Sequence, residues 1–455
     1  MTSGKQGYDT QNNNTAETIM VKTDLKQVKK TDIGLWIFYF GIVFISIIVS
    51  FSSNSQFAYR RSTYFYPWLK HLTMLLVGGG IVFSFQYIKV KWFRVSSLLL
   101  FGANLILQFL CFVPGIRQEN VHNIYRTINL PFTSFDFQPD EYLKFTMVLF
   151  LASLLYYMLR TDNEQKRKTL RWYYIIATLL AVGLTVRYHN STAILLFTIS
   201  YLLYLVSGID FKRTLLFGLV IIACGVIGVT TLRFARHHGV SLPFNLNTLV
   251  TRVDAFFTKE PDDVKFDLYQ GEAQIKYGKI AIAGGRGIIG RGPGRSLERN
   301  KLPVANADYV FAIVVEELGW FGILGTIMLF LLLLSRIGTM MKKTDDEFLS
   351  LVALGCGLTI VLQALISILV VVDLIPSTGQ PLPLISAGGN SIFSISIGLG
   401  IIMSVSRTIN MEAANIDEDS EPSTPVITFD DDADDEIVDL TQQKISFDNE
   451  LDNND

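Results

Sequence analysis

Apolar residues gather in ten blocks along this chain, and polar segments rich in Lys, Arg, Asn and Gly separate the blocks. A helix needs roughly 20 mainly apolar residues to cross the hydrocarbon core of a bilayer, and each block is close to that length. The pattern therefore predicts an all-α polytopic membrane protein with ten transmembrane helices. The predicted spans are 34–52, 68–87, 95–114, 141–159, 170–187, 191–207, 212–232, 309–334, 348–372 and 384–406.

The polar segments between the blocks set the predicted orientation. Short loops rich in Lys and Arg stay on the cytoplasmic side of a membrane. Five such segments alternate onto one side: 22–30, 89–94, 160–171, 211–213 and 336–343. Ten crossings then place both termini in the cytoplasm. The connections predicted to face outward are 53–67, 115–140, 233–308 and 373–383.

Composition agrees with the membrane assignment. The chain has 455 residues, of which 50% are hydrophobic and 18% charged, whereas soluble domains carry about 25% charged residues. The net charge of −2 combines a basic membrane part with an acidic tail. We expect a disordered cytoplasmic segment at 1–30, a membrane domain at 31–410 and a disordered, acidic cytoplasmic tail at 411–455. No nucleic-acid partner is expected.

The connection 233–308, between the predicted seventh and eighth helices, is too long for a simple linker. Its Gly285, Gly287 and Gly290 match a dinucleotide fingerprint, but such a motif needs a strand before it and a helix after it, so we reject that assignment. Glycines do allow backbone N–H groups to approach an anion, and guanidinium groups bind phosphate oxygens in pairs. An anion site is one interpretation; a solvated charge run or contacts with lipid head groups is the other. The arginines concerned are Arg286, Arg291, Arg295 and Arg299.

Acidic residues stand at the start of the eighth predicted span. Asp308 could cap the helix, pair with a loop arginine or act as a general base. Glu316 and Glu317 lie about two turns further in, where an acid costs about 2.5–3.5 kcal/mol on insertion scales. They must either face a polar cavity or make a buried hydrogen bond between helices.

Two further segments carry polar residues at membrane depth. Glu141 and Lys144 follow Pro139 and share one helix face, either as an ion pair or as part of the same polar cavity as Asp308. The segment 376–391 contains three prolines and the pair Gly388-Gly389, which rule out a regular helix. A broken backbone at membrane depth is tolerated where it meets protein or a water-filled cavity, so this segment predicts a cavity. No His or Cys spacing typical of a metal site is present.

Together these motifs resemble the SEDS family (shape, elongation, division and sporulation), whose best-known members are FtsW and RodA. The resemblance covers most of residues 30–410. Its motifs, in order along the chain, are Arg126 with FQPDEYLK, RVDAF at 252–256, YQ at 269–270, GGRGIIGRGPGRS, LPVANADYVFAIVVEELG and LPLISAGGNS. The pattern of the large loop resembles the division branch, FtsW, more than the elongation branch.

The resemblance implies a peptidoglycan glycosyltransferase that polymerises lipid II at the outer face of the bacterial cytoplasmic membrane. The family's essential acid falls on Asp308. The implied substrate-binding residues are Arg126, Glu141, Lys144, Arg252, Arg286, Arg291, Arg295, Ser296, Glu316, Glu317, Ser386, Gly388 and Gly389. A divalent cation, Mg²⁺ or Mn²⁺, could help to neutralise the departing diphosphate, although no ligand set is readable. The implied partners are a class B penicillin-binding transpeptidase and other division or elongation proteins.

The chain departs from the family pattern close to the acid. Asn306 and Ala307 replace a His-Thr pair, Tyr309 replaces Phe, Ala387 replaces Tyr, and Thr127 replaces Trp. Two other functions therefore stay open: a lipid II flippase, which inverted repeats would favour, and a non-catalytic division scaffold.

Overall fold

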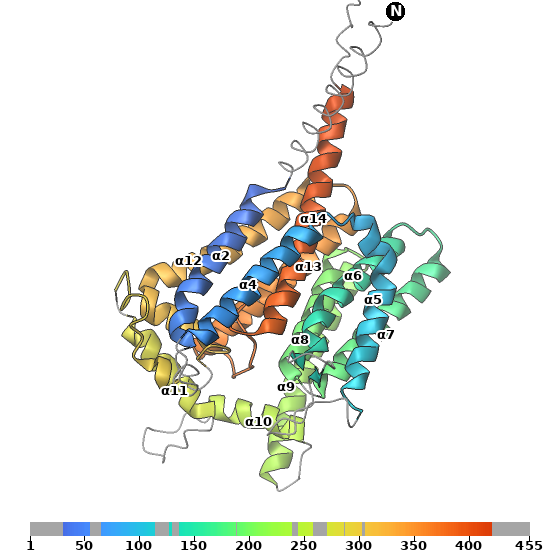
Figure 1. Ribbon diagram of the computed structural model, residues 1–455. Helices are drawn as coiled ribbons and strands as arrows, with labels where there is room; N and C mark the ends of the chain where they lie inside the picture. The colour runs from blue at the N-terminus through green and yellow to red at the C-terminus, as the bar shows by residue number, and fades with distance from the viewer. Residues whose placement is uncertain are drawn as a thin grey trace, which may run out of the picture. The chain divides into compact units, whose positions relative to one another are not determined.

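The computed structural model describes residues 31–54, 65–113, 127–129, 136–187, 189–238, 244–257, 271–285, 287–302 and 305–420. Within these ranges the chain is almost entirely helical (Figure 1). The long helices are α2 (Ile33–Ser53), α4 (Tyr66–Phe85), α5 (Val90–Leu110), α6 (Pro139–Leu159), α7 (Glu164–Val186), α8 (Asn190–Val206), α9 (Phe211–His237), α12 (Val310–Lys342), α13 (Glu347–Val371) and α14 (Gly389–Ser420). Two strands of two residues each, β1 (Ile128–Asn129) and β2 (Asp136–Phe137), form an antiparallel pair.

Each apolar block of the sequence coincides with one of these helices, and the prediction of an all-α polytopic membrane protein is confirmed. In the described part of the chain, nine helices are long and apolar enough to cross a membrane. The remaining one, α8, has 17 residues, at the lower limit for a crossing. The count of ten crossings therefore stays a prediction.

Local sequence explains where several helices begin. The side chains of Asp32, Asn163 and Asp346 accept hydrogen bonds from backbone N–H groups in the first turns of α2, α7 and α13. Proline occupies the first turn of α4 and of α6, where its missing N–H leaves no intrahelical bond unmade. These starts place the polar residues that follow at defined positions on each helix face.

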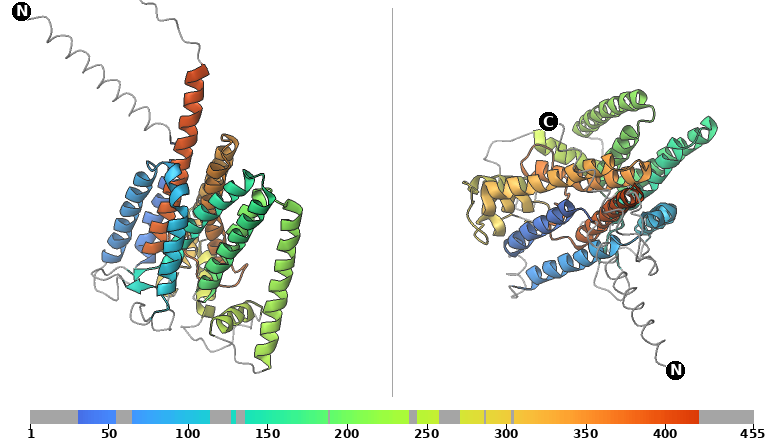
Figure 2. Two further views of the ribbon diagram at one scale, coloured as in Figure 1. Left: turned by 90° about the vertical axis from the view of Figure 1, so that its right-hand side faces the viewer. Right: turned by 90° about the horizontal axis from the view of Figure 1, so that it is seen from above.

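The centre of the bundle is built from α6 and α13, which pack against each other and against α8. On one side α12 packs against α2 and α13; on the other, α5 and α7 pack against α6. Helix α14 lies between α4 and α6 because its glycines permit close approach: Gly398 lies against Phe145 and Gly400 against Phe85. Figure 2 shows this arrangement from two further sides.

Helix α9 differs from the others because none of its described apolar side chains is buried and most are exposed. It contacts only its chain neighbours α8 and α10 to any extent in the described part of the molecule. In a membrane protein such a surface faces lipid or another protein.

The long connection 233–308 is not a simple loop. It contains α10 (Phe244–Phe257), α11 (Gly271–Gly284) and the 3-10 turn η1 (Glu298–Asn300), and α11 packs against α12. In Figure 1, α10 and α11 lie at the lower end of the bundle.

The predicted span at 309–334 coincides with the candidate membrane helix Val310–Lys342, but this helix contains a break. Gly319 has φ 58° and ψ −139°, which breaks α12 into Val310–Leu318 and Trp320–Lys342. The backbone groups released by this break pair with residues 287–292, which we call the glycine loop. Arg291 and Gly292 donate N–H bonds of 2.9 Å to the carbonyls of Glu316 and Glu317, and Phe321 donates one of 3.2 Å to Ile288.

Helix α14 continues past residue 410 to Ser420, so its last turns lie in the segment predicted as a tail. The segment 1–30 and the acidic tail from 421 onward lie outside the described residues, so the predictions of disorder there are not addressed.

Candidate functional site at the start of α12

Asp308 lies in the turn that leads into α12 and is half-buried. The helix cap is Tyr309, and its side chain makes no capping bond, so Asp308 does not act as the N-cap. The turn is fixed instead by the segment before α14. The Ser386 hydroxyl donates to the Ala307 carbonyl at 2.6 Å, and the Ala387 N–H donates to the Asn306 carbonyl at 2.7 Å.

The segment 373–388, which we call the proline loop, borders Asp308. A methyl group at Gly379 would stand 3.4 Å from the Asp308 Oδ2 atom. Arg252 of α10 donates to the Ser377 carbonyl at 3.2 Å, and Lys279 of α11 forms an ion pair with Asp373. Two cationic side chains are thereby attached to the loop that borders the acid.

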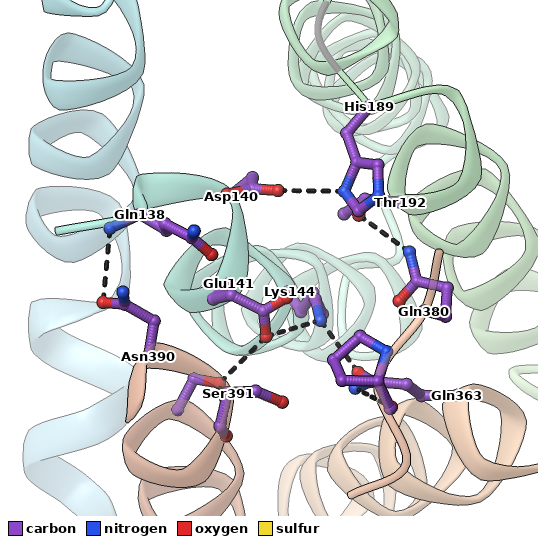
Figure 3. Close-up of polar contacts among 12 residues, drawn as sticks. Gln138, Asp140, Glu141, Lys144, His189, Thr192, Gln363, Gln380, Asn390 and Ser391 are labelled. Carbon is purple, nitrogen blue, oxygen red and sulfur yellow. Dashed lines mark hydrogen bonds and ion pairs between the residues drawn. The ribbon is translucent and has the colours of Figure 1, made fainter. Parts of the chain in front are cut away.

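A second polar group lies inside the bundle, next to Gln380 of the proline loop (Figure 3). The Lys144 ammonium donates to Glu141 Oε2 at 2.9 Å and to Gln363 Oε1 at 2.8 Å. Ser394 of α14 also donates to Glu141, at 3.3 Å. The ion pair predicted from the spacing of Glu141 and Lys144 is present, and Lys144 is completely buried.

Beside this pair, Asp140 Oδ2 lies 3.2 Å from His189 Nδ1 (Figure 3). The same nitrogen is 2.6 Å from the Thr192 hydroxyl, which accepts a bond from Gln380 at 3.0 Å. Sequence reasoning did not find His189, Thr192 or Gln380 as site residues. Their proximity to Asp140 depends on the packing of α8 against α6, which no local spacing reveals.

The proline loop connects these groups into one polar region. Gly379 borders Asp308, Gln380 bonds to Thr192, and the Pro381 carbonyl accepts from Gln363. Ser386 fixes both the Asp308 turn and its own loop, since its hydroxyl also accepts from the Leu382 N–H. The predicted irregular backbone thus runs directly between Asp308 and the Glu141–Lys144 pair, and Gly388 and Gly389 complete its junction with α14.

Glu316 and Glu317 belong to a third group, roughly 12 Å further along α12 at 1.5 Å per residue. Both are fully buried. Glu316 accepts from the Ser296 hydroxyl and from the Leu297 N–H, and Glu317 accepts from the Ser296 N–H. Buried hydrogen bonds to the segment after the glycine loop therefore hold Glu316 and one oxygen of Glu317, while Glu317 Oε2 has no partner in the described part of the chain.

The glycine loop has a structural function that the sequence did not indicate. A methyl group at Gly290 would stand 2.5 Å from the Gly319 nitrogen, and one at Gly285 would collide with the Val315 carbonyl. Two N–H groups of the loop, those of Arg291 and Gly292, donate to carbonyls of α12 and are not available to an anion.

The arginines near this loop occupy different positions. Arg295 is exposed, and Arg291 is largely exposed, with its guanidinium 3.4 Å from Glu316. Arg299 bonds to Ser52 of α2 and to the Gly294 carbonyl. Arg126 and Arg286 lie outside the described residues. Within the described ranges, no three His, Cys, Asp or Glu side chains are grouped closely enough to hold a metal ion.

Fold and site together define a polytopic membrane protein with a connected polar region at one end of the helix bundle. A family model described as "Cell cycle protein", which covers FtsW, RodA and SpoVE, matches residues 33–411. The chain belongs to this family.

Curated proteins with similar sequences belong to the same family. A protein of Nitrosomonas europaea named "Probable peptidoglycan glycosyltransferase FtsW" is 28% identical over 372 residues, covering 80% of this chain and 88% of the relative. A protein of Pseudomonas fluorescens with the same name is 29% identical over 368 residues, covering 79% and 83%.

Solved structures show the same fold. A chain from a structure described as "Structural coordination of polymerization and crosslinking by a peptidoglycan synthase complex" has a TM-score of 0.63 at 22% identity, covering 84% of this chain and 99% of that one. Thermus thermophilus RodA has a TM-score of 0.55 at 20% identity, covering 83% and 97%.

Proposed function

We propose that this protein is a peptidoglycan glycosyltransferase that polymerises lipid II at the outer face of the bacterial cytoplasmic membrane. Asp308 is the general base: it removes the proton from the acceptor sugar's 4-hydroxyl as that oxygen attacks the anomeric carbon of a donor lipid. The bond to undecaprenyl diphosphate breaks, and the configuration at the anomeric carbon inverts.

The single observation that carries this proposal is the position of Asp308 in a chain of this family. Its carboxylate is half-buried, borders the proline loop and lies in a turn fixed by two backbone-directed hydrogen bonds. A base held in place in this way typically contributes 10²–10⁴-fold to rate.

The cations nearby complete the proposed site. Arg252 and Lys279 flank the proline loop, and Arg291 and Arg295 extend from the glycine-loop region. We assign them to the diphosphate, whose growing negative charge they would stabilise. A divalent cation, Mg²⁺ or Mn²⁺, could share this task. Glu141 and Lys144 would then hold the shape of the site rather than contact the reacting atoms.

The proposed partner is a class B penicillin-binding transpeptidase, which crosslinks the new glycan. The curated relatives named above carry the name FtsW, which favours the division branch and division proteins as further partners. The placement of the site on the outer side, with both termini in the cytoplasm, follows from the distribution of Lys and Arg.

The test is glycan synthesis by the purified full-length protein with its transpeptidase, supplied with lipid II. Asp308→Asn keeps the size of the side chain but removes the base, so we expect polymer formation to fall by about 10²-fold or more. Asp210→Asn is the matched control: Asp210 pairs with Arg171 and has a left-handed backbone, which Asn tolerates well.

If the Asp308→Asn variant and the wild type formed polymer at the same rate, Asp308 would not be the general base. Movement of lipid II across a bilayer by wild-type protein, without any polymer, would instead support the flippase. Absence of both activities would support the scaffold.

A further inference from the structure

A pocket of about 150 Å³ opens between the ends of α2 and α4, next to the Asp308 turn. We call it the α2–α4 pocket. Its volume has room for on the order of ten water molecules. Its polar lining comprises Asn54, Tyr66, Lys70, His71 and Asn306, and Pro67, Met74 and Ala387 contribute apolar surface.

The pocket touches the proposed active site through two residues. Asn306 stands two positions before Asp308, and its side chain donates to Asn54 at 3.1 Å. Ala387 follows Ser386 and bonds to Asn306 through the backbone. These are two of the positions at which the sequence departs from the family pattern, and the small side chain of Ala387 leaves the pocket open.

The charge of the pocket favours an anion. No carboxylate lines it, and Lys70 is exposed, with no ion pair or hydrogen-bond partner among the described residues. His71 is 2% exposed, and its Nε2 atom is 2.8 Å from the Ser46 hydroxyl. Its Nδ1 atom has no partner in the described part of the chain. When Ser46 donates to Nε2, the Nδ1 atom carries the proton and is a donor for a ligand.

The surroundings of the pocket favour a lipid. Helix α4 forms one wall, and Leu69, Leu76 and Val77 leave another part of its surface apolar and exposed. A long hydrocarbon chain can lie along this surface while its head group enters the pocket.

We propose that the α2–α4 pocket is an anion subsite that seats the phosphate-bearing head group of a polyprenyl-linked molecule. Lys70 supplies the charge, and His71 supplies a buried hydrogen bond. This assignment rests on the proposed function, because it names a place for the diphosphate of one of its two lipid substrates.

The test is binding of undecaprenyl diphosphate to the purified full-length protein in detergent micelles, measured by native mass spectrometry. Lys70→Gln removes the charge at similar size and should weaken binding about tenfold, as expected for loss of a charge-assisted bond. Lys70→Arg should restore it to within about twofold of wild type, since the charge is kept. Lys168→Gln, an exposed lysine on α7, should leave binding unchanged.

A second variant probes the space itself. Ala387→Leu fills the pocket without changing charge and should also weaken binding. Neutral undecaprenol should bind less tightly than the diphosphate, and inorganic diphosphate should compete poorly because it lacks the chain. Equal binding by wild type, Lys70→Gln and Ala387→Leu overturns the proposal. Competition by inorganic diphosphate as strong as that by the lipid overturns the lipid assignment.

The experiments can distinguish a failure of the proposed polymerase activity from a failure of the proposed anion subsite. Lipid binding that depends on Lys70, in a protein that makes no glycan, would refute the polymerase and leave the subsite in place. Normal polymer formation with lipid binding indifferent to Lys70 would refute the subsite alone.

Discussion

The position of the Lys144 side chain is fixed by contacts within its own helix and with a second helix. Its ammonium group is fully buried and is stabilised by Glu141 one helical turn earlier and by Gln363 on another helix. A buried charge pair adds little net stability, but removing one partner leaves an uncompensated charge. The pair itself lies within α6, and the hydrogen bond from Lys144 to Gln363 links it to α13.

Replacement of Lys144 tests this role. We expect Lys144→Met to destabilise the protein by about 3–5 kcal/mol, because Glu141 is left buried without a cation. The measurement is thermal unfolding in detergent. The double variant Glu141→Gln with Lys144→Met should recover much of the loss, and Lys166→Met at an exposed position should have little effect. A single variant as stable as wild type would show that the pair is dispensable.

The sequence could predict the Glu141–Lys144 pair because its partners are three residues apart on one helix. It could not predict Gln363 or His189, which reach the same region from α13 and α8. Those contacts are set by helix packing, and their separations in sequence carry no periodic signal.

At the scale of elements, the break in α12 and the glycine loop are parts of one structure. Hydropathy alone predicts a continuous helix at this place, because one glycine does not change the apolar character of the span. The partners that satisfy the broken backbone lie about 30 residues earlier, where the same glycines resemble an anion-binding motif. The sequence therefore singled out this segment for its arginines and glycines, but it did not reveal that the segment also pairs with the backbone of α12.

Two glycine variants separate backbone strain from packing. Gly290 and Gly294 both have left-handed φ angles, of 66° and 76°, but only Gly290 has backbone atoms of α12 where a methyl group would go. Gly294→Ala should lose about 1–2 kcal/mol through its left-handed conformation alone. Gly290→Ala should lose about 1–3 kcal/mol more, because the added methyl group overpacks the contact with α12. Thermal unfolding in detergent compares them, and equal losses would contradict the packing role.

At the scale of the whole molecule, the unit that ends at Met411 is a helix bundle, and the residues proposed for the active site lie at one end of it. The all-α architecture could be predicted from the sequence, because a membrane helix can be recognised by its length and its hydropathy. The helices α10 and α11 could not be predicted in this way, since their mixed composition resembles that of a surface loop.

The orientation of the bundle can be tested by labelling single cysteines. The natural cysteines, of which Cys111 and Cys356 are buried and Cys224 is exposed, are first replaced by alanine. A membrane-impermeant maleimide should label Arg295→Cys in spheroplasts and should label Lys168→Cys only after the membrane is permeabilised. Labelling of Lys168→Cys in intact spheroplasts would reverse the proposed topology.

The bent start of α12 has a mechanical consequence. The glycine loop is bonded to both sides of the bend, because its N–H groups donate to Glu316 and Glu317 before the bend and Phe321 after the bend donates back to the loop. The turns of α12 between Asp308 and the bend are buried. A displacement of the glycine loop would therefore act on both halves of α12 at once, and it would reach the Asp308 turn only through the packing of the bundle.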